Sequence, residues 1–443
     1  MNLNNNIQYL RYLLWTYYLL LIFEGALRKW VLPGLATPLL VVRDPICIIA
    51  LILGFPYLVR NRFFWYFSCI GIAGVILAIV IGHGDLIVAL FGGRILLLHF
   101  SLIFLFPVVF DIRDLWAFAK VTLYITIPMT VLVGFQFYLP QSHFVNIGIG
   151  GEGSAGFAGA LGRFRPPGTF SFTAGLSIYY ALSASLLGAW FVGGTRPLPK
   201  LYWIGVACQI IALPLSVSRT LAFSYILIVL SILYTGINSA KSLGRVVFAF
   251  LVIAIIVVPL TQFPVFDDSI DAFMKRWETA TENEGGDSGV VGVLEKRVIG
   301  NITGPLERIE EIPLFGYGIG LGTQTGAYLY FGIRGAVLGE GEWWRVTAEL
   351  GFLLGILFMG TRIWLGIILG LNSLKKNRMG QPAPLILAPM ALYFLTLGDT
   401  GVPTLLGFFV MQVGLWATSL KVNESDYPDQ FGEKATQKGF LNG

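Results

Sequence analysis

The sequence predicts an all-α fold: a polytopic membrane bundle of about 12 transmembrane helices with one large loop that itself contains helices. Hydrophobic residues make up 56% of the 443 residues and charged residues only 12%, about half of the roughly 25% usual in soluble domains. The mean hydropathy is +0.74. The apolar residues also occur in blocks long enough to cross a bilayer, which takes about 20 residues per helix. These features exclude a soluble enzyme, a disordered protein and a fibrous repeat protein.

Each predicted span is a run of apolar residues. The runs lie near residues 10–27, 36–59, 64–82, 94–111, 117–138, 169–193, 201–217, 219–236, 245–261, 345–371, 382–398 and 401–420. The first run is not followed by a small-x-small cleavage site, so we expect an anchor that stays in the protein. The runs divide the chain into a bundle of nine spans (1–261), a large loop (262–344), the last three spans (345–420) and a polar tail (421–443).

The net charge of +5 belongs to short loops between apolar runs, which is typical of a membrane protein and not of a nucleic-acid-binding surface. The bases fall in alternate loops, at Arg60 and Arg62, Arg113 and Lys120, Arg196 and Lys200, Lys241 and Arg245, and Lys375, Lys376 and Arg378. Loops rich in Lys and Arg stay in the cytoplasm. We therefore expect cytoplasmic termini and no nucleic acid as a partner.

Two long loops then face the outer side. The first, 140–168, is rich in glycine. The second, 262–344, holds 13 of the chain's 25 acidic residues, so we expect a solvated and folded segment. Apolar residues recur in it at helical spacing, at Leu294, Val298, Ile302, Leu306 and Ile309. We expect helices that lie over the outer face of the bundle.

Several basic residues lie at the outer side, where the charge rule disfavours them. They are Arg28, Lys29, Arg43, Arg94, Arg163, Arg165 and Arg219. Arg43 adjoins Asp44, which favours a local ion pair. No such local partner accounts for Arg163, Arg165 and Arg219. Three guanidinium groups on one face can form a planar, bidentate site for phosphate, which is the role we expect for them.

The sequence offers neither an ATP site nor a metal site. The Gly-rich run 148–158 is not followed by Gly-Lys-Ser/Thr, so it is not a phosphate-binding loop for ATP. The histidines, His83, His99 and His143, lack metal-ligand spacing. We therefore expect no metal and no cofactor. A lipid-linked phosphate at the outer leaflet suits the arginines better than a nucleotide.

Acidic residues cluster where the chain returns to the membrane, in the sequence EGEWWRVTAELG of residues 340–351. Glu342, Arg345 and Glu349 share one helical face because they are three and seven residues apart. Two interpretations stay open. The cluster is either the start of an interfacial helix with its two tryptophans as aromatic anchors, or the site of a partly desolvated glutamate that acts as a general base.

Several motifs occur in an order that resembles a known family. Residues 163–172 read RFRPPGTFSF, residues 216–220 read SVSRT and residues 313–320 read PLFGYGIG, with Arg297 sixteen residues before that proline. The chain then re-enters the membrane as ELGFLLG. This order around one large outer loop resembles the O-antigen ligase and polysaccharide polymerase superfamily of bacterial inner membranes, over roughly residues 140–360.

The resemblance implies a metal-independent, inverting transfer of a glycan from undecaprenyl pyrophosphate to a sugar hydroxyl at the periplasmic face. The large loop would be periplasmic. The partners would be the lipid-linked donor, a glycan or lipid acceptor, membrane lipids and polysaccharide-assembly proteins. By position, Arg219, Arg297 and either Arg163 or Arg165 match the arginines that bind the pyrophosphate.

Ligases of this family usually carry a histidine nine residues before the Glu-x-Gly of the returning span, where this chain has Glu340. We therefore expect Glu340 or Glu342 to be the catalytic base, with Arg345, Glu349 and Arg94 in support. The departure leaves a polymerase at least as well supported as a ligase. The alternatives are a transporter or flippase for lipid-linked sugars, which would carry charge deep in several spans, and a membrane scaffold of polysaccharide assembly.

Overall fold

The computed structural model describes residues 3–154, 156–194, 198–237, 244, 263–285, 289–332, 338 and 341–421. Its described residues are all-helical, with 78% helix and 2% strand, which confirms the all-α part of the predicted fold class; the predicted count of about 12 spans is not confirmed. The α-helices are α1 (Leu3–Ala26), α2 (Asp44–Leu58), α3 (Arg62–Val80), α4 (Leu86–Arg94), α5 (Phe100–Val109), α6 (Ile112–Tyr138), α7 (Thr173–Gly193), α8 (Tyr202–Ser216), α9 (Arg219–Ile237), α11 (Asp267–Gly285), α12 (Gly289–Glu307), α13 (Gln324–Phe331), α14 (Glu342–Arg378), α15 (Ala383–Leu397) and α16 (Pro403–Ser419).

Eight helices of the described chain are long and apolar enough to cross a membrane, which supports a multi-pass membrane protein. They are Asn5–Val31, Pro38–Leu58, Arg62–Val80, Leu86–Val109, Ile112–Tyr138, Thr173–Gly193, Arg219–Gly236 and Glu342–Arg378. The shorter helices α8, α15 and α16 also coincide with predicted spans. The predicted span 245–261 lies outside the described residues.

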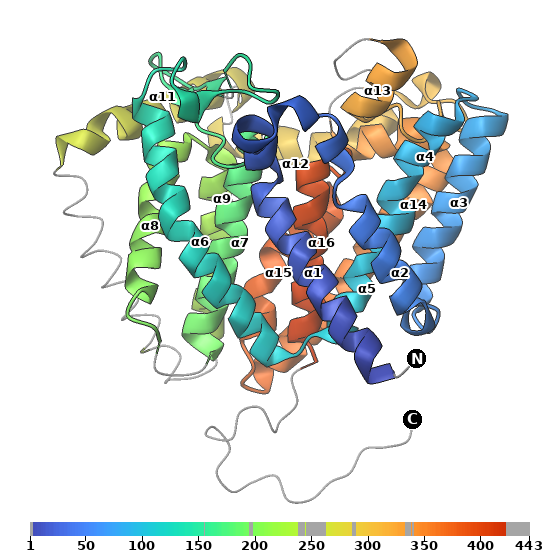
Figure 1. Cartoon of the computed structure of the whole chain (residues 1–443), viewed down its shortest axis with the longest axis horizontal. Coiled ribbons are helices and arrows are strands. Elements are labelled where there is room, and N and C mark those ends of the chain that lie inside the picture. The colour runs from blue at the N-terminus through green and yellow to red at the C-terminus, as the bar shows by residue number, and fades with distance from the viewer. Residues whose placement is uncertain are drawn as a thin grey trace, which may run out of the picture.

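The helices run up and down between two ends of a bundle, as Figure 1 shows. The helices α11, α12 and α13 all lie at one end, which we call the loop end. Helix α12 confirms the helix predicted from the apolar periodicity of this segment. The α2–α3, α5–α6 and α14–α15 connections and the start of α8 lie at the opposite end, and Arg60, Arg113, Lys200 and Lys376 lie in these segments or within three residues of them.

The centre of the bundle is formed by α16, which packs against α5, α7 and α15. Its side chains are almost wholly apolar, and Phe409 lies 4.6 Å from Phe100 between ring centroids. The indole of Trp416 is fully buried and donates to the Ser373 hydroxyl at 2.8 Å. A well-packed central helix fixes the positions of the elements around it.

Helix α14 is folded back on itself, which differs from the single straight span predicted near 345–371. Arg362 Nη1 donates to Glu342 Oε1, although these residues are 20 positions apart. A straight helix would separate them by about 30 Å at roughly 1.5 Å per residue. The chain reverses at Gly351, whose φ of 80° and ψ of 164° are non-helical. A Cβ there would lie 2.2 Å from the Leu314 carbonyl oxygen, so only glycine fits.

The glycine-rich loop between α6 and α7 is built around a short antiparallel hairpin, β1 (Phe157–Ala158) with β2 (Phe164–Arg165). Gln136, near the end of α6, fixes the loop with three side-chain hydrogen bonds, one of them to the Val145 carbonyl at 2.9 Å and the other two to Gly168. Its amide nitrogen donates to the Gly168 carbonyl at 3.1 Å, and its amide oxygen accepts from Gly168 N at 2.7 Å. The loop therefore holds Arg165 at a defined position above the bundle.

Candidate functional site

A cleft of about 260 Å³ lies at the loop end of the bundle, where the glycine-rich loop, the α8–α9 turn, α12 and the α15–α16 turn meet. It is lined by Arg165, Ala174, Ser177, Ile178, Ser218, Thr220, Asn301, Gly341, Glu342, Tyr393, Phe394, Leu397, Gly398, Asp399 and Leu405. The lining combines one cationic side chain, Arg165, with the acidic residues Glu342 and Asp399. Residues more than 200 positions apart in the sequence thus form one polar recess.

Arg165 is the cation that lines the cleft, and together with the nearby Arg219 and Arg276 it forms what we call the cationic wall. Its Nε is buried and has no hydrogen-bond partner among the described residues. Burial lowers the pKa of the Arg165 guanidinium to about 10, and the nearby positive charges of Arg276 and Arg219 add to this effect. A cation with an unfilled donor and neighbours of the same charge is suited to bind an anion.

The SVSRT motif forms the sharp turn from α8 into α9. Val217 adopts a left-handed conformation with φ 46° and ψ 42°, which is strained for a β-branched residue. Ser218 caps the next helix, because its hydroxyl accepts from Leu221 N at 3.3 Å and from the Ser177 hydroxyl at 2.8 Å. The turn thereby starts α9 at Arg219, beside Arg165.

Arg276 belongs to the same cationic group but was not predicted. It comes from α11, and its Nη1 donates to the carbonyls of Ala158 and Gly159 at 3.4 and 3.3 Å. These bonds join α11 to the β1–β2 hairpin, which carries Arg165. No feature of the sequence indicates this role, because Arg276 is one of several charged residues in an amphipathic helix.

Two other predicted arginines lie apart from the cationic wall. Arg163 pairs with Asp268 and lies over the rings of Phe137 and Tyr138, so it does not line the cleft. This position does not support its predicted role in phosphate binding. Arg297 is exposed on α12, one turn before the cleft residue Asn301, and its charge acts on Tyr393 in the cleft lining.

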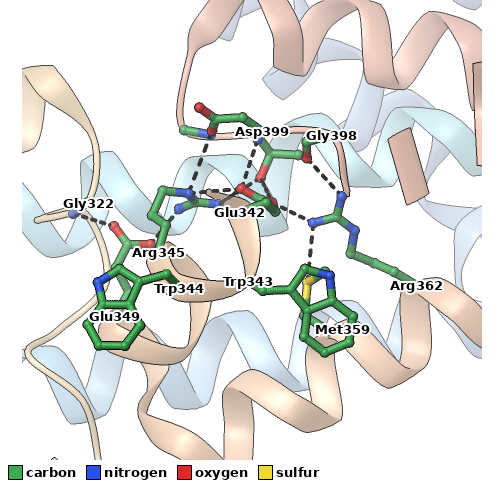
Figure 2. Close-up of polar contacts among 12 residues, drawn as sticks. Gly322, Glu342, Trp343, Trp344, Arg345, Glu349, Met359, Arg362, Gly398 and Asp399 are labelled. Atoms are coloured by element: carbon green, nitrogen blue, oxygen red, sulfur yellow. Dashed lines mark hydrogen bonds and ion pairs between the residues drawn. The ribbon is translucent and has the colours of Figure 1, made fainter. Parts of the chain in front are cut away.

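Glu342, one of the two residues predicted as catalytic, meets the predicted supporting residues Arg345 and Glu349 in a buried network, shown in Figure 2. Glu342 is fully buried and accepts hydrogen bonds through both of its carboxylate oxygens. Arg345 donates to Oε2 through Nε at 3.0 Å and Nη2 at 2.9 Å. Arg362 donates to Oε1, and Thr400 donates to Oε1 through its hydroxyl and to Oε2 through its backbone.

These contacts argue against Glu342 as the general base. Five donors fill the lone pairs of its carboxylate, so no position is left for a substrate proton. Two arginines also stabilise its charged form. Glu342 instead holds α14 against the α15–α16 turn. The other predicted base, Glu340, lies outside the described residues.

Arg345 and Glu349 connect this network to the PLFGYGIG motif. Glu349 accepts from the backbone of Gly320 at 2.9 Å and Gly322 at 2.8 Å, and from Arg345 Nη1 at 2.6 Å. The backbone of Tyr317 also donates to the Ala348 carbonyl at 2.7 Å. The motif thus packs on the folded helix α14, and the predicted supporting residues Arg345 and Glu349 join it to the Glu342 network.

Asp399 is the carboxylate best placed to accept a proton. It lies in the α15–α16 turn, its side chain is 42% exposed to the cleft, and its Oδ1 accepts from Gly401 N at 2.7 Å and lies 3.8 Å from Arg345 Nε. Burial within the recess raises the pKa of Asp399 above its ordinary value, as does the Glu342 carboxylate, while Arg345 acts in the opposite direction. Glu342 is saturated, whereas Asp399 keeps an oxygen for a substrate.

Sequence reasoning missed Asp399 and Arg362, although both leave a signal. Asp399 is the only charged residue between Arg378 and Lys421. Arg362 is a lone charge inside an apolar run, and it is fully buried with Nη2 donating to the carbonyls of Phe394 and Gly398. Charged residues inside spans generally mark a site or a structural pair.

Arg94 belongs to a second buried network, none of whose described members lines the cleft. It donates to both oxygens of Asp44 at 2.9 and 2.8 Å, and His99 Nε2 lies 3.0 Å from the same carboxylate. We predicted that Arg43 pairs with its neighbour Asp44. In the structure Arg43 pairs instead with Glu24, at 3.0 Å. The supporting role predicted for Arg94 at the site is therefore not supported by its position.

Within the described part of the chain, no group of three or more His, Cys, Asp and Glu side chains is arranged to hold a metal ion. No protein-family model matches the chain. No curated protein matches it either. The site is therefore interpreted from its own geometry.

Proposed function

We propose that this protein is a membrane glycosyltransferase that moves a glycan from undecaprenyl pyrophosphate to a sugar hydroxyl in surface polysaccharide polymerisation or ligation. One observation carries the proposal: a single cleft is lined both by Arg165, whose buried Nε has no hydrogen-bond partner among the described residues and which has Arg219 and Arg276 near it, and by the partly exposed carboxylate of Asp399. A diphosphate leaving group and a hydroxyl nucleophile require these two kinds of group.

The proposed reaction is a single displacement that needs no metal ion. The acceptor hydroxyl gives its proton to the Asp399 carboxylate as its oxygen bonds to the anomeric carbon. The bond from that carbon to the diphosphate oxygen breaks on the opposite face, so the configuration inverts. The departing diphosphate takes the bonding electrons, and the cationic wall stabilises the charge that develops on it.

The buried network prepares the acidic side of the cleft. Glu342 bonds to Thr400, the residue after Asp399, and Arg362 bonds to the carbonyl of Gly398, the residue before it. Both neighbours of the proposed base are thereby fixed to α14. A base that is held in place needs little reorganisation when the substrate arrives.

The arrangement of charges supports a cleft on the outer face of a bacterial inner membrane. The basic residues Arg60, Arg113, Lys200 and Lys376 lie in or near the helix connections at the end opposite α11–α13. Basic connections stay in the cytoplasm, so the loop end with its cleft would face the periplasm and both termini would be cytoplasmic. Lipid-linked glycans await transfer at that face.

The test is transfer by the purified protein in lipid nanodiscs, with an undecaprenyl-pyrophosphate-linked repeat unit as donor. We expect free undecaprenyl pyrophosphate and an elongated glycan. A ladder of repeats would mean a polymerase, and one addition to a fixed acceptor would mean a ligase. Arg165→Gln should lower transfer roughly 10- to 100-fold, the value of one or two charge-assisted hydrogen bonds. Equal transfer by Arg165→Gln and the matched control Arg163→Gln would contradict the proposal.

A transporter of lipid-linked sugars is the second candidate, because the structure places charges inside several helices. Glu24, Asp44 and Arg94 are held in one buried network, and Glu342 and Arg362 in another. Intramembrane charges often mark transport pathways. Proteoliposomes distinguish the two functions: a transporter moves the intact donor across the bilayer, whereas a transferase releases undecaprenyl pyrophosphate.

A further inference from the structure

The large loop changes character in its second half. No Asp, Glu, Lys or Arg occurs from Ile312 to Gly332, whereas the first half of the loop is strongly acidic. This charge-free segment contains the PLFGYGIG motif and α13. A solvated loop of such length normally carries charged residues, so its composition is closer to that of a membrane-facing segment.

The segment buries Ile312, Ile319 and Leu321 but exposes most of its other large apolar and aromatic side chains. Those 41–58% exposed are Leu314, Phe315, Tyr317, Tyr328, Leu329, Tyr330 and Phe331. Only Gly326 and Ala327 of α13 are buried. Exposed apolar patches of this kind mark a surface that contacts a partner or a membrane.

The patch continues the lipid-facing surface of two predicted spans. Helix α13 packs on α4. The exposed side chains nearest along the chain to the α3–α4 turn are also apolar, namely Val80, Ile81, Leu86, Ile87 and Leu90. His83, in that turn, lies 5.5 Å from the Tyr330 ring, and its Nε2 lies 3.2 Å from the Ile319 carbonyl. The patch therefore lies at the level where α3 ends and α4 begins.

The opposite side of the loop end differs in charge. Helix α11 lies at the upper left in Figure 1, whereas α13 lies at the upper right. Helix α11 exposes Asp267, Asp268, Glu278 and Glu282 around Met274. Charged groups of this density remain in water. The loop end thus has one water-facing side and one apolar, tyrosine-rich side.

We propose that the segment Ile312–Gly332 rests in the interface between lipid head groups and acyl chains and anchors the loop to the membrane. Tyrosine suits this depth because its ring is apolar and its hydroxyl is polar. The anchor would also set the height of the cleft, since Gly320 and Gly322 of this segment bond directly to Glu349. The inference does not depend on glycosyl transfer.

The test is the depth of a nitroxide label at Leu329→Cys in lipid nanodiscs, in a Cys69→Ser background because Cys69 is an exposed native thiol. Met274→Cys on α11 is the matched control, because Met274 is 50% exposed and Leu329 is 48% exposed. Relaxation by lipid-soluble oxygen and by a water-soluble nickel chelate is compared at both sites. We expect the oxygen-to-nickel ratio to be several-fold higher at 329 than at 274.

A label at Leu314→Cys, also in the patch, gives an independent position in case one variant fails to fold, and it should behave as 329 does. Equal ratios at 274 and at both patch positions would overturn the proposal. Dipolar broadening between labels at 329 would overturn it in favour of a second copy of the chain. Protection of 329 from the nickel chelate only when a soluble glycan is added would overturn it in favour of a carbohydrate surface.

Discussion

Two buried charge networks hold the bundle together, but only one of them reaches the cleft. The network on α14 joins Glu342 and Glu349 to Arg345 and Arg362, and it ends next to Asp399. The network of α1, α2 and α4 joins carboxylates to arginines in the same way, yet none of its members lines the cleft. The similarity of the pairs shows that burial of charge alone does not identify a site.

The α1–α2–α4 network ends instead on backbone atoms near the cleft. Arg43 of this network donates to the Pro403 carbonyl at 2.7 Å. Lys29, which follows the network residue Arg28 in the sequence, donates to the carbonyls of Gly168 and Phe170 at 2.7 and 3.0 Å. These segments border the turn that carries Asp399 and the loop that carries Arg165. We infer that this network positions the two walls, whereas the α14 network contributes a group to the chemistry.

The largest expected effect is on Asp399→Asn. The amide keeps the shape of the side chain and can still accept from Gly401 N, but it cannot take a proton from a hydroxyl. Transfer should fall by about 10²- to 10⁴-fold, the usual contribution of a positioned base. The rate in nanodiscs measures this, with donor binding as the control that the cleft is intact. An unchanged rate would remove Asp399 from the mechanism.

Glu342→Gln should act through stability. It removes a buried charge, which leaves Arg362 without its carboxylate and Arg345 with Glu349 as its close carboxylate partner, and a broken buried pair costs about 3–5 kcal/mol. Thermal unfolding in detergent measures the loss. Glu278→Gln is the control, since Glu278 pairs only at the surface with Lys275. A variant that is stable but inactive would return Glu342 to the list of catalytic bases.

The pH dependence of transfer should show both walls of the cleft. Asp399 must be ionised to accept a proton. Because its pKa is raised, transfer should begin to fall at a higher pH than it would with an ordinary aspartate, whose pKa is about 3.9. Arg165 must be charged, and its pKa of about 10 means that donor binding weakens as pH rises through that value. Each limb should change the rate about tenfold per pH unit. An acid limb that persists in Asp399→Asn would assign it to another group.

A smaller effect should follow from Tyr17→Phe in the second network. The Tyr17 hydroxyl lies 2.9 Å from His99 Nδ1 and accepts from Arg43 Nη1 at 3.4 Å. Its removal leaves buried polar groups unsatisfied and should cost about 1–3 kcal/mol of stability. Transfer per folded molecule should change little, which thermal unfolding and rate measurements together can check. A loss of rate without a loss of stability would bring this network into the chemistry.

The smallest effect should be that of Arg163→Gln. Its partner Asp268 has a side chain that is 58% exposed, and exposed pairs contribute about 1 kcal/mol or less. Unfolding temperature and transfer rate should both stay close to those of the unchanged protein. A large loss of donor affinity would mean that Arg163 turns into the cleft when substrate binds.

The helical fold could be predicted from the sequence because hydropathy acts locally. The runs at 117–138, 169–193 and 219–236 coincide with helices α6, α7 and α9 within a few residues. The reversal of α14 could not be predicted in this way, because apolar composition does not reveal the direction of a helix. Gly351 is one of 53 glycines, and nothing local sets it apart.

The site was partly predictable. Arg165 and Arg219 stood out because bases are disfavoured on the outer side, and the structure places them in one cationic group. The pairing of Glu342 could not be foreseen, since its second partner Arg362 reaches it only after the chain turns back. Asp399 was not predicted as a site residue, because a single acid between two apolar runs does not by itself distinguish a functional residue from an ordinary turn residue.

The reversal at Gly351 also affects the field inside the recess. The short helix that begins at Glu342 starts at the cleft wall, since Gly341 and Glu342 both line it. Its leading amide hydrogens act as roughly half a positive elementary charge, which has no proton to lose. Some attraction for a diphosphate should therefore survive in alkali, after Arg165 has lost its proton.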